Sequence, residues 1–161
     1  MLDHEWKRIE DYNPGYPQYT ALIAAHEPYY ISRRFGRLRA RLLLQKQDKL
    51  SMLEEELDKI AANESARLFL GSSRDDTNLP RREVLKEIDT AMADFDEFVR
   101  RNSEIMGLSK PVDRDVTNLR NWLNATGSIS WAESDYLNHR DDLVSVSPIG
   151  PDAAGNQLEP I

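Results

Sequence analysis

The sequence predicts an all-α protein built on an antiparallel, coiled-coil-like hairpin of two long helices, which shorter helices complete into a four- or five-helix bundle. Two observations favour this class. Two long segments carry apolar residues three and four positions apart, the spacing that puts side chains on one face of a helix. A short polar loop joins these segments, so the simplest arrangement folds one helix back along the other.

The composition fits one intracellular domain. Hydrophobic residues make up 40% of the 161 residues, which is enough for a single core. The net charge of -7 argues against a nucleic-acid-binding surface, so we expect no nucleic-acid partner. The chain has no cysteine, which excludes disulfides and thiolate sites and fits a cytosolic location. No run of about twenty apolar residues predicts a membrane span.

Changes in composition set the expected domain limits. Residues 1–15 are a polar lead-in, and residues 16–147 carry the helical patterns. Residues 148–161 contain glycine and proline and few large apolar residues, so we expect a disordered tail. Pro17 suits the first turn of a short helix, and Pro28 ends that helix and can begin the next one.

The first long helix is predicted from Ile31 to Ile60, with Gly71 as the stop after its pattern blurs. Its apolar residues are Ile31, Phe35, Leu38, Leu42, Leu43, Leu50, Leu53, Leu57 and Ile60. Gly36 in the helix interior would cost about 1 kcal/mol relative to alanine. With Ala40 one turn later, it is a candidate close-packing ridge for another helix or an aromatic ring. The alternative is a tolerated weak position.

The second long helix is predicted over 81–106, and Gly107 supplies its stop. Its apolar residues again lie three and four apart: Leu85, Ile88, Met92, Phe95 and Val99. Thr77 or Asn78 is expected to cap its start. The loop at 71–80 is rich in serine, aspartate, threonine and asparagine, and we expect it to be mobile.

The C-terminal part predicts shorter elements. A third helix starts after Pro111, with Asp113 as its cap. We expect its buried side to consist of Val116, Leu119, Trp122 and Leu123. A short helix or turn follows at 131–139, in which Trp131, like Trp122, is interpreted as a core residue. The segment after it is predicted to be extended and contains Leu143, Val144 and Val146.

A basic cluster is the strongest local charge feature of the sequence. The candidate contacts for a partner or a lipid are Arg33, Arg34, Arg37 and Arg41. Three of these arginines are four residues apart, so they line one flank of the predicted helix and could meet phosphate groups. The alternative is intramolecular pairing, because the antiparallel helix offers Glu97 and Glu104 near the basic end.

No motif for catalysis stands out. His139, Asp141 and Asp142, with Asp135 nearby, could be drawn as metal ligands, but carboxylates that pair with arginines are the better interpretation. The sequence lacks a glycine-rich phosphate loop, a nucleophile elbow and paired helical histidines. We therefore predict no catalytic residue, cofactor or metal site, and we expect a chain that is not an enzyme.

Several blocks of the sequence resemble a known family. They include Arg33 to Leu44, Leu119 to Leu123 and His139 to Ser145, in this order along the chain. With Tyr16-Pro17 at the start, they resemble the fungal family called domain of unknown function 6594. The resemblance implies a helical intracellular domain that typically precedes hydrophobic, membrane-spanning helices. It implies no activity and no catalytic residue.

These observations leave three functional hypotheses. The leading one is a non-enzymatic helical interaction or regulatory module that binds an unknown protein. The second is a membrane-surface bundle that lays its apolar stripe on anionic lipid. The third is an enzyme with an unrecognised site. A second copy of the chain could also bury the long stripe, so homo-oligomers through the long helix are a further expectation.

Overall fold

The computed structural model describes residues 7–147, and it confirms the all-α class. The chain forms two compact units. The hairpin unit comprises Phe35–Met106, and the terminal unit combines residues 7–34 with residues 107–147. The predicted disordered tail at 148–161 lies outside the described residues. No helix within the described residues is long and apolar enough to cross a bilayer.

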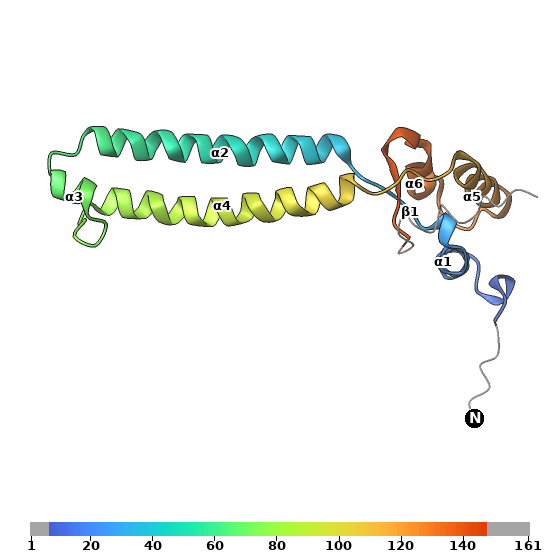
Figure 1. The fold of residues 1–161 in the computed structure, drawn as a ribbon. Helices are drawn as coiled ribbons and strands as arrows, with labels where there is room; N and C mark the ends of the chain where they lie inside the picture. Colours follow the sequence, from blue (N-terminus) through green and yellow to red (C-terminus); the bar gives the residue numbers. More distant parts are fainter. Residues whose placement is uncertain (1–6, 148–161) are drawn as a thin grey trace, which may run out of the picture. The chain divides into compact units, whose positions relative to one another are not determined.

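The hairpin unit contains the two long helices, α2 (Gly36–Ala62) and α4 (Leu79–Met106), side by side and antiparallel (Figure 1). Its core consists of Leu53, Val84 and Ala91, with Leu50, Leu57, Ile60 and Ile88 packed around them. The predicted hairpin is thus confirmed. The first helix ends earlier than expected, at Ala62, and a separate short helix, α3 (Arg67–Gly71), ends at the predicted stop.

A buried ion cluster fixes the loop of the hairpin. Arg81 donates from Nη1 to Asp76 at 2.8 Å and from Nη2 to Glu64 at 3.1 Å. The three side chains are all less than a tenth exposed. Asn78 caps α4 as predicted, since its side-chain oxygen accepts from the Arg81 amide at 3.0 Å, and it also donates to Glu64. These bonds therefore tie the end of the loop next to α4 to Glu64, which follows α2.

The prediction that α2 begins at Ile31 is wrong. Residues Ile31–Arg33 form a strand, β1, which pairs antiparallel with β2 (Leu143–Ser145). The helical spacing of the apolar residues could not reveal this pairing, because the hydrogen-bonding partner lies more than a hundred residues away in the chain. Phe35 then adopts a left-handed conformation, with φ of 55°, and α2 starts at Gly36.

The terminal unit has a core of its own, between α1 (Tyr16–Ala25), α5 (Asp113–Thr126) and the β1–β2 pair. It contains Tyr19, Leu22, Ile31, Val116, Leu119, Leu123, Leu137 and Leu143. Trp122 packs against this core, with its ring 6.0 Å from that of Tyr19. The core prediction for Trp131 is wrong, since it is 79% exposed.

Short elements complete the terminal unit. They are η1 (Ile9–Asp11), η2 (Glu27–Tyr29), α6 (Trp131–Ser134), η3 (Asp135–Asn138) and η4 (Arg140–Asp142). Pro28 was predicted to begin the next long helix, but it lies in the short helix η2 instead. Asp113 is the first residue of α5 rather than its cap. Tyr16 donates to Glu133 at 2.9 Å, which ties the start of α1 to α6.

Candidate functional site

The hairpin exposes apolar side chains on both long helices, and four of those on α4 form a row. This outer row consists of Leu85, Met92, Val99 and Met106, which are seven residues apart. Their side chains are 44, 43, 40 and 40% exposed. Residues seven apart lie almost above one another on a helix, so the four side chains form one apolar row with steps of about 10.5 Å.

The outer row borders the contact between the two helices. Val84, Ile88 and Ala91 of α4 pack against α2. The outer-row residues Leu85 and Met92 directly follow Val84 and Ala91 in the sequence. The sequence placed Leu85, Met92 and Val99 in the buried stripe. That interpretation is wrong, because a single partner helix covers only a narrow seam, and the apolar stripe of α4 is wider than this seam.

The opposite flank of α4 is charged instead. It carries Glu87, Asp94 and Arg101, again seven residues apart. Lys46 of α2 forms an ion pair with Asp94 and lies 5.6 Å from the ring centre of Phe98. Charges at such flanking positions are normal for a solvated coiled-coil edge. The two flanks of one helix therefore differ sharply in chemistry.

The structure divides the basic cluster into two parts. Arg33 and Arg34 belong to the terminal unit, where both pair with Asp142, at 3.1 and 3.6 Å. The Arg34 amide also donates to the Asp142 carbonyl at 2.8 Å. The structure thus brings together two blocks that carried the family resemblance, and their ion pairs support the β1–β2 pair.

Arg37 and Arg41 lie in α2 and are exposed. Neither forms an ion pair within residues 7–147. The predicted pairing of the cluster with Glu97 and Glu104 is wrong. Both glutamates bind Arg100 of their own helix at 2.8 and 3.2 Å, because the i to i+3 and i+4 spacings are closer than the neighbouring helix. The Arg100 hydrogen bond lowers the pKa of Glu97.

The candidate close-packing residues Gly36 and Ala40 lie at the start of α2 and not in its interior, where they were expected. Gly36 is the first residue of α2 and is half-buried, so the cost of an interior glycine does not arise. Ala40 is exposed. Among the described residues, no group of histidines and carboxylates is arranged to hold a metal ion. His139 Nε2 lies 3.5 Å from Asp135 Oδ2. Asp142 pairs with arginines, as the sequence analysis favoured over a metal site.

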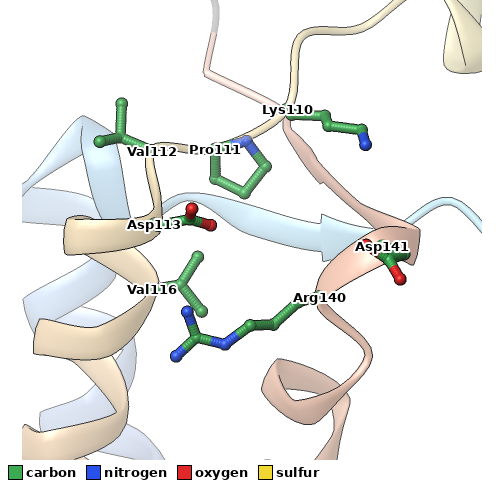
Figure 2. A pocket seen from close by; sticks show the side chains of 7 residues that line it. All are labelled: Lys110, Pro111, Val112, Asp113, Val116, Arg140 and Asp141. Atoms are coloured by element: carbon green, nitrogen blue, oxygen red, sulfur yellow. The ribbon is translucent and has the colours of Figure 1, made fainter.

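An open cavity of about 470 Å³ lies in the terminal unit, between the start of α5 and η4 (Figure 2). Its lining consists of Lys110, Pro111, Val112, Asp113, Val116, Arg140 and Asp141. Figure 2 shows Asp113 turned toward the space between the two elements, and Arg140 reaching below Val116. Arg140 donates to Thr117 at 3.1 Å. The described residues that line this cavity include no histidine and no hydroxyl side chain, so its polar chemistry is that of charged groups alone.

The comparisons with known proteins identify a family. The model of the family of unknown function DUF6594 matches residues 16–160, most of the chain. The chain belongs to this family. No match was found among curated proteins or among solved structures. The DUF6594 assignment confirms the resemblance seen in the sequence, and it names no activity.

Sequence reasoning missed two features of the DUF6594 hairpin. It did not assign Val84 and Ala91 to the core, and it did not foresee the buried cluster around Arg81. A signal for the first was available, since Val84, Ile88 and Ala91 also follow the four-three spacing. None was available for Arg81, because a buried arginine looks like a surface arginine in a sequence.

Proposed function

We propose that this DUF6594 chain is a non-enzymatic interaction module whose hairpin binds an amphipathic helix. The observation that supports the proposal is the outer row of α4, an apolar line beside the seam of the hairpin. A third helix with its own apolar face would cover this line as the next member of a bundle. The charged opposite flank would stay in water.

The spacing of the outer row favours a helical binding partner rather than an extended peptide. Its residues recur every seven positions, the repeat with which two helices keep contact over several turns. Three heptads span about 32 Å at 1.5 Å per residue. An extended peptide would instead need an unpaired strand edge, which the hairpin helices do not offer.

Cross-linking mass spectrometry on the intact chain in cells tests the proposal. We expect cross-links from the wild-type hairpin to helical segments, and their loss in Met92→Glu, because a carboxylate in the row cannot be buried against an apolar face. Met52→Glu is the matched control, since Met52 is a 63% exposed methionine of α2 outside the row. Equal cross-links in both variants contradict the proposal.

A second candidate, a membrane-surface module, draws support from Arg37 and Arg41. Exposed arginines without an ion pair among residues 7–147 suit anionic lipid headgroups. Flotation with phosphatidylserine vesicles at low and high salt separates the candidates. Lipid binding lost in Arg37→Glu/Arg41→Glu favours the membrane module, whereas no binding at low salt rejects it. Under either candidate we propose an intracellular location, in the cytosol or at a membrane face.

A further inference from the structure

We propose that the helix covering the outer row comes from a second copy of this chain, and that two hairpins pack in opposite directions as a four-helix bundle. The inference rests on the proposed function, because it names the occupant of the same face. Three observations carry it: the size of the face, the charge gradient along α2, and the spacing of the outer row.

The face has the size that a stable dimer needs. α4 contains 28 residues, so the hairpin is about 42 Å long. Two packed helices present a face about 20 Å wide, which gives roughly 800 Å² per copy. A standard specific interface buries about 800 Å² per partner. The hairpin face therefore offers enough area without a contribution from any other element.

The charges of α2 change sign along its length. Its first half carries Arg37 and Arg41, and its second half carries Glu54, Glu55 and Asp58. None of these five forms an ion pair within the described part of the chain. The glutamates of α4 near the basic half, Glu97 and Glu104, do not compensate it, because they already bind Arg100. A second copy running in the opposite direction would place each basic half beside an acidic half.

The spacing allows one two-fold axis to satisfy both helices. Leu85 and Met106 are equally far from the midpoint between Met92 and Val99, so a reversed copy puts each apolar side chain opposite another. Arg37 and Asp58 are three heptads apart on one row of α2, with their midpoint beside Gln47. The Lys46–Asp94 ion pair places these two midpoints at about the same level of the hairpin.

Light scattering of the full chain after gel filtration tests the association. We expect the wild type at the mass of two chains, and Met92→Glu/Val99→Glu at the mass of one, with Kd raised at least about 100-fold. Circular dichroism should show the same helix content in both. Met52→Glu, the matched control outside the row, should remain a dimer. A dimer that survives Met92→Glu/Val99→Glu overturns the inference.

The orientation is tested by cysteine cross-linking, which the absence of native cysteines makes specific. Gln47→Cys, close to the proposed axis, should form a covalent dimer with a short bismaleimide. Arg37→Cys alone should not, because the two copies of this position lie about 32 Å apart. A mixture of Arg37→Cys and Asp58→Cys chains should cross-link. Self-linking of Arg37→Cys overturns the opposed arrangement.

Different results would contradict the second-copy inference and the helix-binding function. A wild type that remains a single chain at all concentrations overturns the second-copy inference. If Met92→Glu, but not Met52→Glu, then still loses cross-links to another protein in cells, the helix-binding function stands. If neither substitution changes any cross-link, both the function and the inference are rejected.

Discussion

Single residues show how strongly burial decides what a charge does in this molecule. Arg81 is 7% exposed and binds two carboxylates, whereas Arg100 binds two glutamates on an open helix surface. An exposed ion pair contributes little, because water and salt screen it. Removing one member of a buried cluster leaves uncompensated charge without solvent, which destabilises the fold.

We expect Arg81→Leu to destabilise the hairpin and to lower Tm by at least about 5 °C, since Glu64 and Asp76 would keep their burial and lose their cation. Thermal denaturation followed by circular dichroism at pH 7 measures this change. Arg82→Leu, at the exposed neighbouring position, is the control and should shift Tm little. Similar shifts in both variants would contradict the role assigned to the cluster.

The same cluster predicts a loss of stability in acid. Hydrogen bonds from Asn78, the Ala66 amide and Arg81 lower the pKa of Glu64 below its usual 4.5. Bonds from Arg81 and the Asn78 amide lower the pKa of Asp76 below its usual 3.8. The folded state then binds fewer protons than the unfolded state, so this stability is present above the usual values and is lost as pH falls through the folded ones.

Urea denaturation from pH 7 to pH 3 measures this acid effect. We expect the free energy of unfolding to fall below about pH 5, and to fall less steeply in Glu64→Gln/Asp76→Asn. Glu97→Gln removes a carboxylate whose pKa is also lowered, but it should change the slope less than the double variant, because water and salt screen this exposed pair. An unchanged slope in the double variant would show that other carboxylates cause the effect.

At the scale of elements, burial on α2 is decided by helix phase. Met52 and Leu53 are neighbours in the sequence, yet Met52 is 63% and Leu53 is 6% exposed. Successive residues of a helix point about 100° apart, so a seam one helix wide covers only one of them. The sequence assigned Leu53 to the stripe correctly, because that row has one partner helix inside the same hairpin.

We expect Leu53→Ala to lower the free energy of unfolding by roughly 2–4 kcal/mol, through lost burial and the cavity it leaves. Met52→Ala, the adjacent and exposed position, should change it by less than about 0.5 kcal/mol. Urea titrations followed by circular dichroism compare the two. Equal losses would place the seam of the hairpin elsewhere on α2.

At the scale of the whole molecule, the two units have separate cores and separate spectroscopic reporters. Trp122 and Trp131 lie in the terminal unit and no tryptophan lies within Phe35–Met106, so their fluorescence reports on the terminal unit. The two long helices of the hairpin dominate the circular dichroism signal. The two cores share no residue, so a core substitution in one unit should act mainly on the reporter of that unit.

We therefore expect Leu119→Ala, at a position with 0% exposure, to lower the fluorescence midpoint by the equivalent of about 2–5 kcal/mol. The circular dichroism midpoint should move less. Leu53→Ala should show the reverse order. Trp131→Ala removes a 79% exposed side chain and is the neutral control for the terminal unit. Coincident midpoints in every variant would mean that the units unfold as one cooperative body.

The sequence by itself determined the all-α class, the two long helices, a helix cap at Thr77 or Asn78 and the extended segment at Leu143, because these depend on local spacing and local hydrogen bonds. Only the tertiary structure decided which apolar row is buried, because a helix pattern wider than one seam does not say how many helices cover it. It also decided the strand at Ile31 and the partners of Arg33 and Arg81. Those features depend on residues distant in the chain, and local periodicity carries no information about such contacts.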